Sequence, residues 1–260
     1  MKQNRRRRFA TTVLIGVAAA FPVTGLEAQR GISMPPASTR SDAPMKMAEH
    51  SMSGAMDSIM MKHMELSATR RATQADSTRA FAVVKELREA IAKYQDTATA
   101  VADGYVMFAP GMKHQKTYHF TKNGNALLGA FTFSPGRPTS LLYEQDASGK
   151  MRLVGAMYTM PKRASLSRLN DRIPLSIARW HKHVNWCLPA KDQQGRWTET
   201  KNGMPVFGPE SPIVTQAECD IVGGRFEPTV FGWMVHANVF AGDDLGTIFA
   251  AHHEGGLSGH

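Results

Sequence analysis

The sequence lacks the short motifs that mark the common catalytic chemistries. It has no Gly-x-Ser-x-Gly nucleophile turn, no glycine-rich phosphate loop and no dinucleotide-binding fingerprint. A His-Glu-x-x-His zinc motif is also absent. Lysine and arginine do not cluster with interleaved aromatic residues, which argues against a nucleic-acid partner. If the protein has a functional site, its residues are therefore expected to come from separate parts of the sequence.

Long apolar runs are absent as well. The one candidate, residues 9–24, is short and is interrupted by two threonines and a proline. Because it follows the basic run Arg5–Arg8, it predicts a cleaved secretory signal peptide over residues 1–28 and no membrane span in the mature chain. The run Arg6–Phe9 also resembles a twin-arginine signal. The sequence therefore predicts a bacterial protein that is periplasmic or secreted.

Cysteine is scarce, since Cys187 and Cys219 are the only two among 260 residues. Exported proteins fold under oxidising conditions, so a lone pair of cysteines favours a structural disulfide. The alternative interpretation is that Cys187 is a thiolate metal ligand. The segment 1–28 holds five Lys or Arg and one Glu, so the formal charge of the remaining chain is +5 and not +9.

Large apolar side chains are scarce over residues 29–72, which are rich in Ser, Ala, Pro and Met. This composition cannot offset the entropy of ordering, so it predicts a flexible segment. Thioether sulfur is a soft ligand that selects Cu(I), and imidazole also suits copper. The segment is therefore a candidate for metal capture, and the alternative is a weakly amphipathic segment that packs on the domain. The candidate capture ligands are Met45, Met47, His50, Met52, Met56, Met60, Met61, His63 and Met64.

Residues 73–245 predict a single domain of the α+β class, in which an N-terminal helix packs on a mainly antiparallel β-sheet or a small β-barrel-like domain. Apolar residues recur at helical spacing over residues 73–104. Short strand and turn patterns follow, and residues 246–260 are predicted to be a flexible tail containing histidines. The expected strands are 117–120, 139–144, 151–160, 177–187 and 229–240, and the expected short helices are 165–170 and 215–221.

The most informative stretch is Trp180–Cys187, which is rich in aromatic and β-branched residues and predicts a strand. Alternate side chains of a strand point to the same face. His181, His183, Asn185 and Cys187 are therefore expected on one face. Two imidazoles on one face of a rigid sheet are typical of a metal site.

A second predicted strand, 231–236, places Met234 and His236 on one face. If the two strands face a common interior, His181, His183 and His236 form a three-histidine site. The alternative is that these histidines are ordinary sheet residues held by stacking or hydrogen bonds. The further candidate ligands, from a segment bounded by Gly and Pro and from the strand after it, are Met112, His114 and His119.

Several motifs occur in series along the chain, namely Gly111–His114, Leu141–Glu144 and Leu153–Gly155. In combination they resemble a family of uncharacterised exported bacterial proteins, in which a Gly-Met-x-His segment precedes an LLYE…LVG hairpin. The resemblance covers residues 90–240. It implies export and a shared domain, and it implies no particular reaction.

Three functional hypotheses follow. The first is an exported metal-binding protein for copper binding or copper homeostasis, in which the Met/His-rich segment captures the ion and the histidine strands hold it. The second is a metalloenzyme, an oxidoreductase or a hydrolase, with a cupin-like three-histidine centre and an open coordination position. Zinc or iron are the other candidate ions. The third is a structural or binding domain whose histidines bind no metal. The Met/His-rich segment favours the first, because an enzyme needs no such segment.

Overall fold

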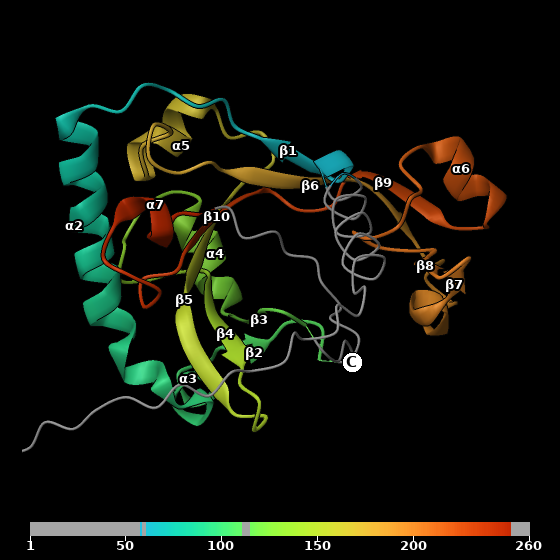
Figure 1. Ribbon diagram of the computed structural model, residues 1–260, viewed down its shortest axis with the longest axis horizontal. Coiled ribbons are helices and arrows are strands. Elements are labelled where there is room, and N and C mark those ends of the chain that lie inside the picture. The colour runs from blue at the N-terminus through green and yellow to red at the C-terminus, as the bar shows by residue number, and fades with distance from the viewer. Residues whose placement is uncertain (1–57, 59–60, 111–114, 251–260) are drawn as a thin grey trace, which may run out of the picture. The chain divides into compact units, whose positions relative to one another are not determined.

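The computed structural model of the protein describes residues 58, 61–110 and 115–250 (Figure 1). All of these residues belong to one compact unit. The predicted signal peptide and most of the Met/His-rich segment lie outside the described residues.

An antiparallel sheet forms the centre of this unit. Its strand order is β1-β6-β10-β5-β4-β3-β2, and β9 pairs with β6 beyond the end of β10. The sheet is open, which confirms the α+β class with a mainly antiparallel sheet and rules out the barrel-like alternative. The strands are β1 (Met64–Leu66), β2 (Val106–Met107), β3 (Tyr118–Thr121), β4 (Ser140–Gln145), β5 (Met151–Met160), β6 (His181–Leu188), β9 (Arg225–Thr229) and β10 (Trp233–Ala237).

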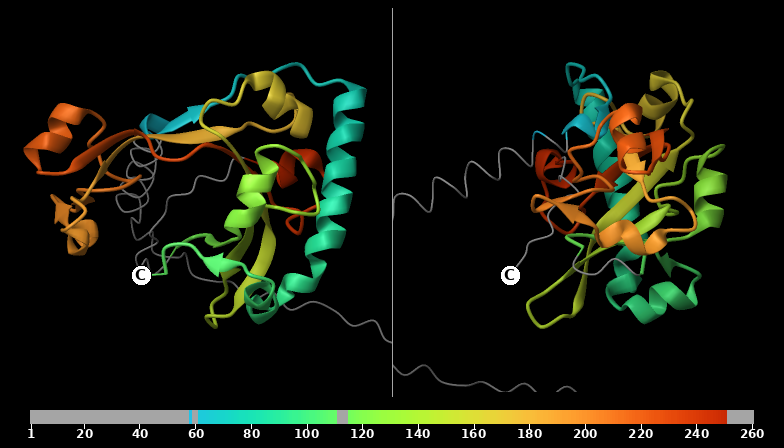
Figure 2. Two further views of the ribbon diagram at one scale, coloured as in Figure 1. Left: turned by 180° about the vertical axis from the view of Figure 1, so that it is seen from behind. Right: turned by 90° about the vertical axis from the view of Figure 1, so that its right-hand side faces the viewer.

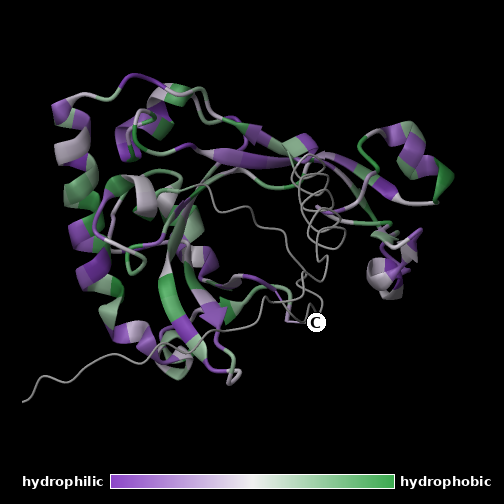
Figure 3. Cartoon of the chain, in the orientation of Figure 1, coloured by the Kyte–Doolittle hydropathy of each residue, from purple (hydrophilic) through white to green (hydrophobic). Residues whose placement is uncertain are grey.

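One long helix, α2 (Gln74–Ile91), covers one face of the sheet. Thr73 caps its N-terminus and forms a reciprocal capping box with Asp76. Figure 3 shows apolar and polar residues alternating around this helix. The helix predicted over 73–104 is in fact broken. A 3₁₀ turn, η1 (Ala92–Gln95), precedes α3 (Thr97–Ala102), because the Asp96 side chain accepts a hydrogen bond from the backbone of Ala98 and starts a new helix.

The main core lies between α2 and the sheet. Tyr143 and Tyr158 are buried there, and their hydroxyls donate hydrogen bonds to the backbone oxygens of Tyr94 and Pro135, each at 2.7 Å. Burial raises the pKa of both tyrosine hydroxyls. The largest fully buried apolar side chains of this core are Trp180, Leu87, Ile91, Leu141, Leu153, Leu169, Ile173, Leu175 and Ile248.

The folded region extends beyond the predicted limits of 73 and 245. At its N-terminal end β1 pairs with β6. At its C-terminal end α7 (Leu245–Ile248) buries Ile248 and Phe249 in the main core. Two more short helices, α4 (Asn123–Gly129) and α5 (Leu166–Arg172), follow β3 and β5. No helix among the described residues combines the length and the apolar character that a membrane crossing requires.

The strand predicted over 229–240 is divided, because β9 ends at Thr229 and β10 begins at Trp233. Gly232 lies in the break, where a Cβ atom would stand 2.0 Å from the backbone oxygen of Met160. This close approach of two backbone segments turns the chain from β9 into β10.

β6 and β9 run side by side out of the sheet and carry the distal arm, residues 187–226 (Figures 1 and 2). The predicted disulfide is confirmed there, since Cys187 is bonded to Cys219 with their Cα atoms 5.4 Å apart. A Cβ atom on Gly224 would lie 2.4 Å from the Cys187 sulfur, so only glycine fits against the bond. The arm also contains η2 (Gln194–Thr198), β7 (Thr200–Lys201), β8 (Met204–Pro205) and α6 (Gln216–Ile221).

Candidate metal centre

The face of the sheet opposite α2 carries four histidines from three strands. Tyr118 and Phe120 of β3 belong to the main core, so His119 between them points to the other face. By the same alternation Met234 and His236 of β10 point away from α2, since Trp233, Val235 and Ala237 belong to the main core. The remaining two histidines are His181 and His183 of β6.

The four rings form a continuous row. The ring centroids of His119 and His236 are 5.6 Å apart. Those of His236 and His181 are 5.2 Å apart, and those of His181 and His183 are 5.5 Å apart. His181 and His236 are each 8% exposed and His183 is 5% exposed. The prediction that His236 lies on the same side of the sheet as the β6 pair is therefore supported by direct ring neighbours, and His119 extends the row.

The sheet must curve strongly to make this row. β3 and β10 are separated by β4 and β5, so three interstrand steps of about 4.8 Å would place them about 14 Å apart in a flat sheet. The His119 and His236 rings nevertheless lie 5.6 Å apart. The face is therefore concave, and in Figure 1 β6 lies on one side of β5 and β4 while β3 and β2 lie on the other.

A register shift between Leu142 and Tyr143 contributes to this curvature, because a bulge bends and twists a strand. Gly155 contributes too. A Cβ atom there would lie 2.1 Å from the backbone oxygen of Ala237, so the end of β10 approaches β5 more closely than a side chain would allow.

Three methionines stand directly across from three of the histidines. Met64 of β1 is the register partner of His183. Met234 of β10 is the partner of His181, and Met157 of β5 is the partner of His236. Residues that face each other in an antiparallel pair share a face, with Cβ atoms about 4.5–5.5 Å apart. Each buried imidazole of the row therefore has a thioether as its cross-strand neighbour.

Met157 was not predicted from the sequence. Its place depends on the pairing of β5 with β10, which no local pattern reveals. The place of Met64 is secured by its neighbour in sequence, because Glu65 pairs with Lys182 on the opposite face at 2.9 Å. The Lys182 ammonium also lies 4.4 Å from the centroid of the Trp233 ring.

An aromatic cluster closes the row at His183. The ring centroid of His183 lies 5.1 Å from that of Trp186 and 6.1 Å from that of Phe231. Phe231 in turn lies 5.9 Å from Phe108. Asn185 has a φ of 57°, and this left-handed conformation interrupts the alternation of the strand, so that Trp186 contacts His183 three residues away.

Two sequence-based expectations about this strand need correction. Cys187 was expected on the histidine face together with Asn185. The conformation of Asn185 breaks the pattern, and Cys187 is buried in the distal arm with Cys219 and Phe207. Because its sulfur is disulfide-bonded, Cys187 is not a thiolate ligand.

His63 has a different environment from the row. It is 1% exposed, with Nε2 at 2.6 Å from the backbone oxygen of Ser211 and Nδ1 at 3.3 Å from that of Val184. These contacts tie the chain before β1 to β6 and to the distal arm, so the ring is engaged in the fold. Of the other predicted capture ligands, Met61 is exposed and Met64 lies in β1. Those outside the described residues are Met45, Met47, His50, Met52, Met56 and Met60, together with Met112 and His114 from the second predicted set.

The four imidazole rings are neighbours, but their nitrogens are not arranged as the ligands of one metal ion. Within residues 61–110 and 115–250, no three His, Cys, Asp or Glu side chains are grouped as a metal-holding set. The predicted convergence of three ring nitrogens on one point is therefore not seen in these ranges.

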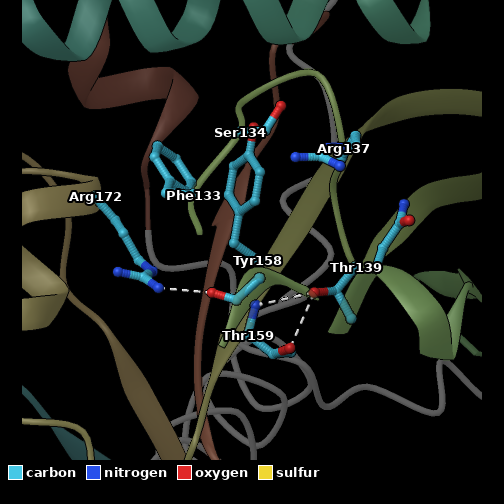
Figure 4. A pocket seen from close by; sticks show the side chains of 9 residues that line it. Phe133, Ser134, Arg137, Thr139, Tyr158, Thr159 and Arg172 are labelled. Atoms are coloured by element: carbon cyan, nitrogen blue, oxygen red, sulfur yellow. Dashed lines mark hydrogen bonds between the residues drawn. The ribbon is translucent and has the colours of Figure 1, made fainter. Parts of the chain in front are cut away.

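A small cavity lies elsewhere, beside α4 and α5 (Figure 4). Its volume is about 10 Å³, which is room for about one water molecule. Arg172 donates a hydrogen bond to the Gly129 backbone oxygen at 2.6 Å, and the hydroxyls of Thr139 and Thr159 are 2.9 Å apart. Burial lowers the pKa of the Arg172 guanidinium. No histidine lines this cavity, and it is too small for an organic substrate.

Comparison with known proteins adds no relative. No family model, no curated protein and no solved structure matches the chain. The resemblance to exported bacterial proteins therefore stays a prediction, and a functional proposal for this chain depends on the geometry of the concave face.

Proposed function

We propose that this protein binds a copper ion on the concave face of its sheet, through the histidine row and the methionines opposite it. The observation that carries the proposal is the cross-strand pairing of Met64, Met157 and Met234 with three buried histidines. The disulfide is consistent with an exported copper-binding protein, because such bonds persist in oxidising compartments.

The donor types favour copper over the other candidate ions. Imidazole nitrogen suits zinc, iron and copper alike, whereas thioether sulfur is a soft donor that selects Cu(I). Zinc sites in proteins use Cys, His, Asp and Glu and not methionine. A face that alternates imidazoles with thioethers therefore matches a monovalent copper ion best.

The spacing of the rings also suits a shared ion. Two imidazoles that bind one ion tetrahedrally at about 2.0–2.1 Å have ring centroids about 5 Å apart. The neighbouring pairs in the row are 5.2, 5.5 and 5.6 Å apart. Neighbouring rings of the row are therefore spaced as two ligands of one ion would be.

The Met/His-rich segment leads directly into this face. Met61 and Met64 belong to its C-terminal end, and Met64 is already the partner of His183 in the sheet. In the proposed function the upstream methionines and His50 capture the ion, and the row receives it next to Met64. The soft thioethers of the segment and of the face have the same preference for Cu(I).

The metalloenzyme hypothesis has weaker support. A cupin-like centre sits in a two-sheet jelly roll, whereas the histidine row lies on one open, curved sheet. The cavity of about 10 Å³ beside α4 does not include the row. The donor set and these two observations together favour binding of the ion over chemistry on a substrate.

A competition titration with a Cu(I) chelator tests the proposal. Met157→Leu should weaken Cu(I) binding at least tenfold, because it removes one thioether from the concave face. Met160→Leu is the matched control, since Met160 lies on the same strand but in the main core, and it should bind Cu(I) like the parent protein. Zn(II) binding should be the same in both variants.

The histidines are tested in the same way. His181→Ala and His236→Ala should each reduce the number of tightly bound Cu(I) ions by one per chain, while the capture segment keeps its own. If both folded variants retain the parent's stoichiometry and affinity, the row is not a copper site and the proposal is wrong.

A further inference from the structure

The short helix α4 and the turn after it expose an unusual amount of apolar surface. Leu127 is 66% exposed, Leu128 is 52% exposed and Phe131 is 78% exposed. No residue of α4 is buried. We refer to these three side chains as the α4 tip. Single exposed apolar residues are ordinary, but three large ones within five positions mark a surface that contacts something.

The α4 tip is held firmly in place. Arg168 and Arg172 of α5 donate hydrogen bonds to the backbone oxygens of Ala130 and Gly129, each at 2.6 Å. These arginines satisfy carbonyl groups that the end of a helix leaves without partners. On the other side, the Asn125 amide donates to the Pro138 backbone oxygen at 2.9 Å. The fold therefore fixes an apolar projection in a defined position.

Basic residues flank the α4 tip. Arg137 and Arg172 line the small cavity together with Gly129 of α4. Lys122 is the N-cap residue of α4, and Arg168 binds the other end of the helix. Exposed apolar groups among basic residues are typical of a surface that docks on anionic lipid.

We propose that the α4 tip inserts into the headgroup region of an anionic phospholipid bilayer and holds the protein peripherally at that surface. Three side chains offer a few hundred Å² at most, which is well below the roughly 800 Å² that each partner buries in a stable protein interface. A lipid surface needs no such matched area, because apolar insertion and attraction between basic residues and anionic headgroups act together. The docking does not depend on copper binding.

A site-specific dye tests the insertion. The only two cysteines form the disulfide, so Phe131→Cys provides a single thiol for an environment-sensitive fluorophore. Vesicles of phosphatidylglycerol and phosphatidylcholine should raise its emission at least threefold and shift it to the blue. Vesicles of phosphatidylcholine alone should change it little, and 0.5 M salt should abolish most of the effect. The control is Ile221→Cys on α6, which is 82% exposed in the parent and should not respond.

Three results would overturn the proposal. An unchanged emission at position 131 with anionic vesicles would show that the tip does not enter lipid. Equal responses at positions 131 and 221 would show adsorption without use of the tip. A response that depends on protein concentration in the absence of vesicles would assign the tip to contact with a second copy of the chain.

Discussion

The two faces of the sheet are made from alternate residues of the same strands, yet they differ in chemistry. The face toward α2 is a core of aliphatic and aromatic side chains, and its buried tyrosine hydroxyls reach backbone oxygens. The concave face carries four imidazoles and three thioethers around a small apolar cluster. Burying imidazoles costs desolvation that aliphatic side chains would avoid. In the proposed function the concave face binds the ion, and the opposite face supplies the hydrophobic core.

The largest effect is expected from the α2 face. Leu141→Ala removes a side chain that is completely buried in the main core, and it should lower the free energy of unfolding by about 2–5 kcal/mol. The Cu(I) affinity of the folded protein should not change. Urea denaturation and chelator competition on the same sample measure both. A loss of Cu(I) affinity without a loss of stability would contradict the assignment of stability to the α2 face and of copper binding to the concave face.

Removal of the disulfide should have the next largest effect. Cys187→Ser combined with Cys219→Ser opens a loop of 32 residues and should cost about 4 kcal/mol in the chain-entropy model. Cu(I) binding should persist, because the sulfur atoms lie in the distal arm and not in the histidine row. Thermal denaturation with and without reductant checks the first part. Disappearance of the copper site in this variant would connect the arm to the concave face.

A change on the concave face should affect stability less and binding more. His236→Leu exchanges a buried ring for an apolar side chain of similar volume, so the free energy of unfolding should change by less than it does for Leu141→Ala, which leaves a cavity. The same variant should lose the Cu(I) bound at the row. Calorimetry and metal titration give the two values, and a stability loss as large as that of Leu141→Ala would make this histidine a core residue.

The smallest effect is expected away from both faces, in the capping box of α6. A hydrogen bond from the Thr215 hydroxyl lowers the pKa of the Glu218 carboxyl. A lowered pKa means that the carboxylate stabilises the fold above its unfolded pKa of about 4.3, and that this contribution disappears as the pH falls through the folded pKa. Glu218→Gln should therefore melt below the parent at pH 7 and together with it once the pH is below the folded pKa of Glu218. A gap that persists at low pH would assign the effect to something other than the charge.

Local patterns in the sequence were sufficient for part of this account. Period-two alternation placed His181 with His183 and Met234 with His236, and the structure agrees for both pairs. The disulfide followed from the scarcity of cysteine in a chain predicted to be exported. These inferences need no knowledge of which strands are neighbours.

The remaining features depend on long-range geometry. His119 joins the row only because the sheet curves across β4 and β5, and Met157 faces His236 only through the β5–β10 register. Trp186 contacts His183 because Asn185 adopts a left-handed conformation, which a strict strand pattern cannot anticipate. The curvature of the sheet, the strand register and the left-handed conformation of Asn185 therefore determine which residues form the candidate site.

X-ray absorption spectroscopy of the protein loaded with one equivalent of Cu(I) tests the central claim most directly. If the ion binds at the histidine row, the spectrum should show nitrogen neighbours at about 2.0 Å and sulfur neighbours at about 2.3 Å. The outer-shell signal of the imidazole rings should disappear when His181→Ala and His236→Ala are combined. A sulfur-only environment that is identical in the parent and in the double variant would contradict the claim, because the ion would then be held by methionines outside the row.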